Sequence, residues 1–406
     1  MHLRLSLPVL LLAAAVMTTG CGPTKAGLDA RAAARERINA FNANFTCDQA
    51  RQEFEVGQFE RALRDVELAI EQSPDVPEFH VLKGRIHLET HRLERAAEAF
   101  STALEKDARC AEAHYYAGIV YQRWSDDTQS YAHYRSAYDI EADNVQYLLA
   151  AAEAMIALGR LDEARGLVDA RLAYFEHNAA LRHLLGQIAL LEGDPKTAAQ
   201  LYAEARLLDP DNDLLLEELA WAQYEAELYA QCHDTVTMIC EKMDEPRADL
   251  IHLQARCLTM LDRPAEAHRL YLQLTRCSPA EASVWVEFGT IAWKLGDYRR
   301  VAQCGVRVVS LAPDRYEGYM LKGLYERHHG RLDEAARLLQ VAADRADETS
   351  LPHLLLGRTL EEAGRDRAAM NAYADAMRVD PQSTEARSLY QQLEARLRVA
   401  AAEDGR

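Results

Sequence analysis

Apolar residues recur at helical spacing along most of this chain, in segments separated by short polar turns. The stretch 179–212 shows the pattern most clearly. Its first segment carries Leu184, Leu185, Ile188 and Leu191, and its second carries Ala198, Tyr202 and Ala205. Gly193, Asp194 and Pro195 separate the two segments, and Asp209 and Pro210 end the second, because a proline cannot continue a helix. The stretch therefore predicts two short antiparallel helices.

The small residue at Gly186 recurs at a nearly constant interval, with one extra residue after the sixth repeat. The ten positions are all Gly or Ala: Ala50, Gly84, Gly118, Ala152, Gly186, Ala220, Ala255, Gly289, Gly323 and Gly357. The Ala198 position is also small in nearly every repeat. Arg171 and Ile239 replace the small residue at the Ala205 position of the fourth and sixth repeats, so we expect looser or differently angled packing there.

This alternation of small and large residues resembles the tetratricopeptide repeat (TPR), whose unit is about 34 residues long. The resemblance implies an all-α fold, a right-handed superhelical solenoid of about ten helix pairs. It also implies an inner, concave surface that is formed mainly by the first helix of each pair and holds extended peptides or partner helices.

The N-terminal segment resembles the signal peptide of a bacterial lipoprotein. Arg4 precedes an apolar run that is too short to cross a bilayer comfortably, and the run ends in Gly20 and Cys21. The resemblance implies that Cys21 becomes the lipidated N-terminus after cleavage. Thr18 departs from the usual aliphatic residue, which leaves ordinary secretion as the alternative. Gly22, in place of the aspartate that signals retention in the inner membrane, favours the outer membrane.

These features divide the chain into four parts. We expect a lipoprotein signal peptide at 1–20, a lipid-attached tether and N-terminal helix at 21–42, and the TPR solenoid at 43–383. A C-terminal capping helix and tail follow at 384–406, because Gln391 stands where another repeat would need Gly or Ala.

Composition and motifs exclude several classes of function. The formal net charge is -18 and no basic cluster interrupts the acidic balance, which argues against a nucleic-acid partner. The motifs of serine hydrolases, P-loop enzymes, zinc peptidases and dinucleotide-binding enzymes are absent, so we predict no enzyme and no cofactor. His87 and His91 are four residues apart, with His80 before them, but a zinc site needs a third ligand and usually an acidic second shell. All three fall at repeat positions that face neighbouring helices, so we expect packing or surface histidines and no metal site.

Cysteine usage leaves two interpretations open. Seven cysteines follow Cys21, and five of them lie between 232 and 304. An exported chain permits a bridge such as Cys240 to Cys257. The alternative is that these residues fill small buried positions, as Cys232 does at an alanine position of the repeat.

The repeat register also places candidate binding residues on the inner surface. The predicted protein-binding groove comprises Tyr115, Arg123, Trp221, Tyr224, Arg256, Trp293, Lys294, Arg327 and Arg358. Aromatic and arginine side chains are common energetic anchors of interfaces. Glu153, Glu217 and Glu225 accompany the fourth to sixth repeats, whereas the basic members follow in the seventh to tenth, so we expect a groove with two oppositely charged ends. The alternatives are that Trp221 and Trp293 pack between repeats and that the charges are only solvated.

Together these patterns predict a lipid-anchored scaffold of the cell envelope, on the periplasmic face of the outer membrane. Its partners would be envelope proteins or peptides in the assembly of a pilus, a secretion system or an outer-membrane complex. It would touch the membrane through its N-terminal lipid only. The alternative is a module that recruits substrate to an envelope hydrolase or glycosyltransferase encoded elsewhere.

Overall fold

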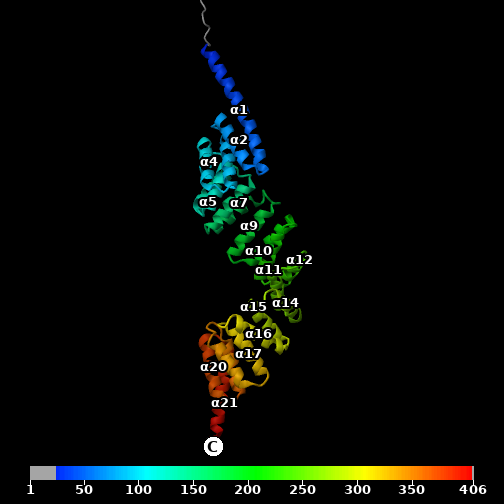
Figure 1. The fold of residues 1–406 in the computed structure, drawn as a ribbon. Coiled ribbons are helices and arrows are strands. Elements are labelled where there is room, and N and C mark those ends of the chain that lie inside the picture. Colours follow the sequence, from blue (N-terminus) through cyan, green and yellow to red (C-terminus); the bar gives the residue numbers. More distant parts are fainter. Residues whose placement is uncertain (1–23, 405–406) are drawn as a thin grey trace, which may run out of the picture. The chain divides into compact units, whose positions relative to one another are not determined.

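The computed structural model describes residues 24–404, and within this range the chain forms 21 α-helices and no strand (Figure 1). This confirms the expected all-α class. The predicted signal peptide and Cys21 lie outside the described residues. None of the helices in the described range has an apolar stretch long enough to cross a bilayer.

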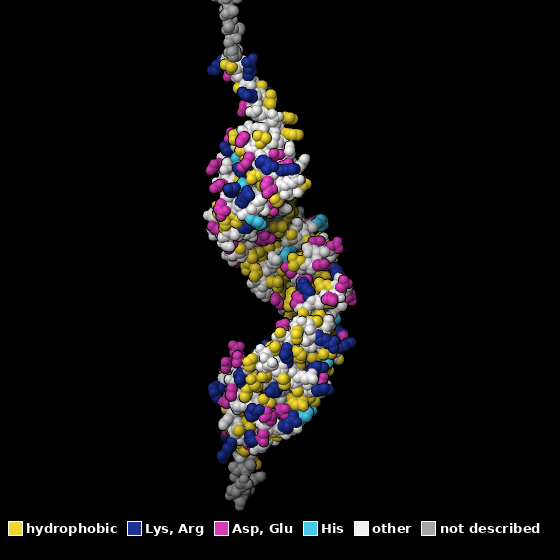
Figure 2. Space-filling model, viewed as in Figure 1, with side chains coloured by type: hydrophobic (Ala, Val, Ile, Leu, Met, Phe, Trp, Pro, Cys, Tyr) yellow, Lys and Arg dark blue, Asp and Glu magenta, His cyan; other side chains and the backbone are white. Residues whose placement is uncertain are grey.

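Consecutive helices pair as the register predicts, and the chain divides into two compact units at Phe175. The first unit holds α1 (Lys25–Glu55), α2 (Phe59–Gln72), α3 (Pro77–Glu89), α4 (Leu93–Lys106), α5 (Ala111–Arg123), α6 (Asp127–Ile140), α7 (Val145–Ala157) and α8 (Leu161–Leu172). The second unit holds α9 (Ala179–Leu191), α10 (Pro195–Leu208), α11 (Asp213–Glu225), α12 (Tyr229–Glu241), α13 (Ala248–Met260), α14 (Pro264–Cys277), α15 (Ala282–Lys294), α16 (Tyr298–Leu311), α17 (Tyr316–His328), α18 (Leu332–Ala343), α19 (Leu351–Glu362), α20 (Asp366–Val379) and α21 (Thr384–Asp404). Charged side chains of both signs cover much of the visible surface of each unit (Figure 2).

The turn inside each helix pair contains one residue in the left-handed conformation. Six of these residues are glycine and four are not: Gly57, His91, Ser125, Gly159, Gly193, Glu227, Asp262, Gly296, Gly330 and Gly364. At Gly193 the backbone N–H donates to the Leu190 carbonyl at 3.0 Å, and the next N–H donates to Ala189 at 2.8 Å, which closes α9. The Asp194 side chain then caps the start of α10. The predicted Gly-Asp-Pro turn is confirmed.

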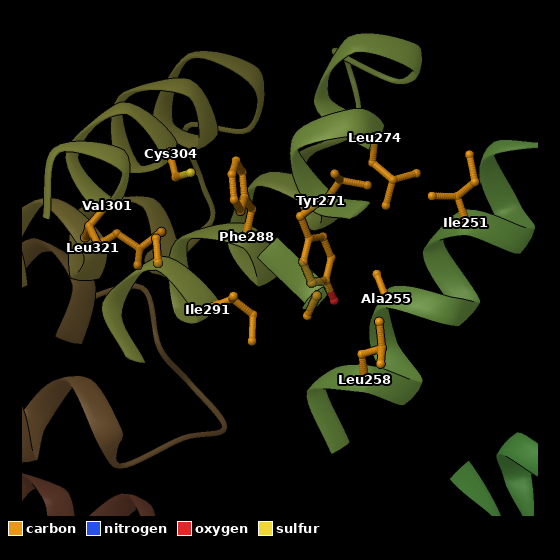
Figure 3. Packing of buried hydrophobic residues seen from close by; sticks show 13 residues of the cluster. Ile251, Ala255, Leu258, Tyr271, Leu274, Phe288, Ile291, Val301, Cys304 and Leu321 are labelled. Atoms are coloured by element: carbon orange, nitrogen blue, oxygen red, sulfur yellow. The ribbon is translucent and has the colours of Figure 1, made fainter. Parts of the chain in front are cut away.

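Small residues lie where the helices approach most closely. All ten residues at the Gly186 position are buried, as are all ten at the Ala198 position. Larger side chains from both helices of the repeats fill the remaining space. In the seventh and eighth repeats, Tyr271 and Phe288 stack with their ring centroids 6.1 Å apart, and Cys304 lies nearby in the same buried cluster (Figure 3). Each repeat therefore contributes to a continuous apolar layer within its unit.

Three residues, Leu191, Arg171 and Ile239, differ in type or in packing from the regular positions of the repeat. Leu191, expected among the packed apolar residues of its helix, is 60% exposed. Arg171 directs its guanidinium to the Ala142 carbonyl at 2.7 Å, because its long side chain can leave the small-residue position and keep its charge partly solvated. Ile239 is buried and belongs to an apolar cluster.

At each end of the described chain a helix continues beyond the paired repeats. Residues 25–42, expected as a tether and N-terminal helix, are continuous with the first repeat in α1, and no break lies at residue 42. At the other end α21 buries Ala386 and Leu393 and exposes Gln391.

The seven described cysteines are free thiols, so the bridge considered between Cys240 and Cys257 is not formed. Cys257 and Cys232 are instead both fully buried in one apolar cluster. Cys232 thus occupies its alanine position as a small buried residue.

Candidate protein-binding surface

The nine residues predicted for the groove all lie on first helices of the repeats. Tyr115 and Arg123 are on α5 in the first unit. The other seven are in the second unit, on α11, α13, α15, α17 and α19.

Three neighbouring first helices of the second unit line an open pocket of about 240 Å³. Helices α11, α13 and α15 supply most of its wall, and the phenol of Tyr271 reaches it from α14. The lining residues are Tyr224, Arg256, Thr259, Met260, Tyr271, Val286, Glu287 and Thr290. The pocket is therefore open on the face that the register assigns to the inner surface, and two of the nine predicted residues meet in it.

Tyr224 and Arg256 form the aromatic and cationic side of the pocket. The guanidinium of Arg256 lies over the Tyr224 ring, 4.9 Å from its centroid. Its Nε is 3.7 Å from Oε1 of Glu287, which is too long for a hydrogen bond. Arg256 thus keeps hydrogen-bonding capacity while its orientation is fixed by the ring beneath it.

Glu287 forms the acidic side, and its carboxylate is held by residues from two other helices. Nε2 of His252 lies 2.6 Å from Oε2, and the Tyr271 hydroxyl donates to the same oxygen at 2.9 Å. Burial alone would raise the pKa of Glu287. The hydrogen bond and charge of His252, the Tyr271 hydroxyl and the charge of Arg256 outweigh burial, so the pKa lies below its ordinary value. Glu287 is therefore a fixed carboxylate at neutral pH.

The same histidine, carboxylate and tyrosine combination occurs two repeats earlier. His183 is hydrogen-bonded to Glu218, and its ring lies 5.6 Å from that of Tyr202. At this place Gln187 stands where the later repeat has Arg256, and Leu191 stands where it has Met260. The exposure of Leu191 follows from this equivalence, because the position faces the inner surface and not the neighbouring helix.

The other basic groove residues of the second unit face carboxylates of that unit. Lys294 lies 3.8 Å from Asp262, and hydrogen bonds join Arg327 to Glu362 at 2.9 Å and Arg358 to Glu385 at 2.6 Å. Glu217, at the expected acidic end, is paired with Arg247 at 2.8 Å. These pairs reduce the charge contrast between the two groups of repeats that the sequence alone indicates.

The two tryptophans differ in their surroundings. Trp293 packs against the buried cluster of its repeat and meets Tyr298 edge to face, with centroids 5.3 Å apart. Trp221 is exposed on α11. Packing between helices therefore accounts for Trp293, whereas Trp221 is available on the surface.

In the first unit, Tyr115 belongs to an aromatic cluster. Its ring lies 5.1 Å from that of Tyr147 and 5.7 Å from that of Tyr134. Burial raises the pKa of Tyr115. Arg123, on the same helix, donates to the Leu88 carbonyl at 3.3 Å.

The sequence did not indicate Glu287, Tyr271 and Met260 of the pocket, nor His252, which holds Glu287 in place. The signal that could have identified Glu287, His252 and Tyr271 is the recurrence of a histidine and a glutamate 35 residues apart, with a tyrosine between them, in two places. Among the described residues, no three His, Cys, Asp or Glu side chains are arranged to hold a metal ion.

Comparison with protein families agrees with the helix-pair geometry. Models described as Tetratricopeptide repeat match residues 47–108, 83–145, 128–188 and 286–350, about half of the chain in all. The chain belongs to the tetratricopeptide repeat family. TPR proteins bind protein or peptide partners.

Individual relatives are distant. The TPR chain is 25% identical over 321 residues to superkiller complex protein 3 of Mus musculus. The matched region covers 74% of this chain but only 18% of the mouse protein. A TPR protein from Parabacteroides merdae has a solved structure with a TM-score of 0.45 and 13% identity, covering 58% of this chain and 93% of that chain. The structure of Pseudomonas aeruginosa PilF gives a TM-score of 0.43 and 19% identity, covering 51% and 94%.

Proposed function

We propose that this chain is a lipid-anchored scaffold of the cell envelope that binds a protein or peptide on the inner surface of its second unit. The observation that carries this proposal is the pocket between α11, α13 and α15, where Tyr224, Arg256 and Glu287 surround about 240 Å³ of space. The scaffold would serve the assembly of a pilus, a secretion system or an outer-membrane complex, on the periplasmic face of the outer membrane.

The chemistry of the pocket suits an extended segment with one apolar side chain. Tyr224, Met260 and Val286 offer apolar contact, and Arg256 can donate to a carbonyl or carboxylate of the segment. Glu287 already accepts from His252 and Tyr271, so its role is to hold Arg256 and its neighbours in place. Binding would be helped because the polar groups are oriented before the partner arrives.

Site-specific photo-crosslinking in cells tests this proposal. Benzoylphenylalanine replaces Met260, which lines the pocket, or Met238, which is also exposed but lies on the second helix α12. The proposal predicts a defined crosslinked envelope protein from position 260 that is absent from position 238 and lost in Arg256→Glu. Crosslinks of equal yield from both positions would contradict it.

The proposed membrane attachment rests on the sequence, in which the N-terminal apolar run ends at Gly20 and Cys21. The proposed acylation of Cys21 predicts incorporation of radiolabelled palmitate. Label that persists in Cys21→Ser would rule out this anchor without bearing on the pocket.

A further inference from the structure

Residues 25–45 of α1 carry large apolar side chains that nothing in the described structure covers. Ile38, Phe41 and Phe45 are 60%, 72% and 68% exposed. The N-terminal end of α1 projects beyond the first repeat (Figure 1), and apolar and basic side chains share its visible surface (Figure 2). Terminal elements of repeat arrays usually present a polar outer face, so this surface needs an explanation.

The three apolar residues form a single stripe. At about 100° of rotation per residue, Ile38, Phe41 and Phe45 fall within roughly 60° of one another around the helix. Ala43 and Cys47, which are buried against the first repeat, lie on the opposite side. The stripe is therefore not a continuation of the repeat core but a second apolar face that points away from it.

Charge is distributed around this stripe with a consistent sign. By the same rotation Arg31 lies about 20° beyond Ile38, at the edge of the apolar sector, and Arg35 and Arg37 lie on its two flanks. Asp29 and Glu36 fall on the far side. The three arginines are exposed and form no ion pair within the described part of the chain. The net positive charge of residues 25–45 contrasts with the formal net charge of -18 of the whole chain.

An apolar stripe flanked by arginines fits the surface of a bilayer that contains anionic lipid. Such helices bury their apolar face at the boundary between headgroups and acyl chains, while the basic side chains reach the headgroups. The helix begins at Lys25, four residues after the cysteine proposed to carry the lipid. We propose that residues 25–45 of α1 lie on an anionic bilayer surface as a second membrane contact beside the lipid. This inference rests on the proposed anchor for its proximity to the membrane.

Depth-dependent quenching tests the contact with the full chain on vesicles of phosphatidylethanolamine and phosphatidylglycerol. Phe41→Trp places a reporter on the stripe, and Leu207→Trp places one at a residue that is 81% exposed in the second unit. Brominated acyl chains should quench the added fluorescence of Phe41→Trp and leave that of Leu207→Trp unchanged. Absence of quenching for Phe41→Trp in a chain that floats with the vesicles would overturn the inference while leaving the anchor intact.

Charge reversal tests the electrostatic part. Arg35→Glu with Arg37→Glu should lower vesicle binding of the unacylated Cys21→Ser chain roughly tenfold or more, because each basic residue near an anionic surface contributes about 1 kcal/mol. The matched control is Arg269→Glu with Arg367→Glu, two exposed residues of the second unit that have the same change in net charge. Equal losses in the two double variants would contradict the proposed contact.

A second copy of the chain is the competing occupant of the stripe. If the apolar stripe joined two chains, sedimentation velocity would show a dimer that Phe41→Ser with Phe45→Ser converts to a monomer. That result would overturn the membrane proposal, whereas a monomer in both cases, together with quenching at position 41, would support it.

Discussion

A Cβ atom added to Gly186 would lie 2.5 Å from Cε1 of Tyr202 on the paired helix. The same relationship joins Gly84 to Phe100, Gly118 to Tyr134 and Gly357 to Tyr373, at 2.3–2.5 Å. Where the first helix has alanine, the second helix often has the smaller valine: Ala50 with Val66, Ala152 with Val168, and Ala220 with Val236. In these seven helix pairs the combined volume of the two residues is therefore similar, whereas Ala255 with Tyr271 and Gly289 with Gly305 depart from the pattern.

We expect Gly186→Ala to destabilise the helix pair by about 1–3 kcal/mol, because the added methyl group overlaps the ring of Tyr202. Tyr202→Val alone should also destabilise, by leaving a cavity. The double variant reproduces the Ala152 and Val168 combination. Its loss in free energy of unfolding should be smaller than the sum of the losses in the two single variants. Urea unfolding of all four proteins measures this coupling, and additive losses would show that the two residues do not share the contact.

The left-handed residue in the sixth repeat offers a stabilising substitution. Glu227 has a φ of 62° and is exposed, whereas six of the ten equivalent residues are glycine. Glu227→Gly should raise the free energy of unfolding by about 0.5–1 kcal/mol, since the relief of backbone strain exceeds the entropy that glycine adds to the unfolded chain. Glu227→Ala keeps the strain and should show no such gain in a parallel urea titration.

The depressed pKa of Glu287 makes part of the stability dependent on pH. The stabilisation is fully present above the unfolded pKa of about 4.3, and it is lost as the pH falls through the lower folded pKa. The difference in unfolding midpoint between wild type and Glu287→Gln should therefore be largest near neutral pH and shrink below about pH 4. Glu241→Gln, at an exposed residue of α12, should show no such trend.

The two tryptophans should respond differently to truncation. Trp293→Ala should lower the free energy of unfolding by roughly 1–3 kcal/mol, because its ring packs against Tyr298 and the buried cluster. Trp221→Ala should leave stability nearly unchanged and weaken partner binding, because its ring is exposed on the inner surface. Thermal unfolding together with the crosslinking yield at position 260 separates the two effects. A loss of stability in Trp221→Ala would show instead that the Trp221 ring packs between helices.

Periodicity predicted the parts of the fold that repeat. Gly186 and its equivalents are set by the distance between helix axes, and Gly193 is set by the backbone conformation of the turn, so both recur in the sequence. The continuity of α1 was also readable, since no glycine or proline lies between Leu28 and Val56. The boundary expected at residue 42 marks the start of the first repeat and not the end of a helix, so α1 runs through it.

The details of the candidate site could not be read in the same way. Arg327 and Arg358 meet Glu362 and Glu385, which lie 35 and 27 residues further along the chain. Such pairs depend on the rotamers of long side chains, which the repeat does not fix. The charge pattern alone therefore overstated the contrast along the groove, and it gave no sign that Tyr271 reaches the inner surface from a second helix.

The affinity of the purified chain for the partner crosslinked at position 260 tests the central claim most directly. Arg256 and Arg263 are similarly exposed, at 41% and 46%, but only Arg256 lines the pocket. Isothermal titration calorimetry should show a loss of roughly tenfold or more for Arg256→Ala, as expected for an arginine anchor, and little change for Arg263→Ala. Equal affinities of the two variants for the partner would contradict a binding site between α11, α13 and α15.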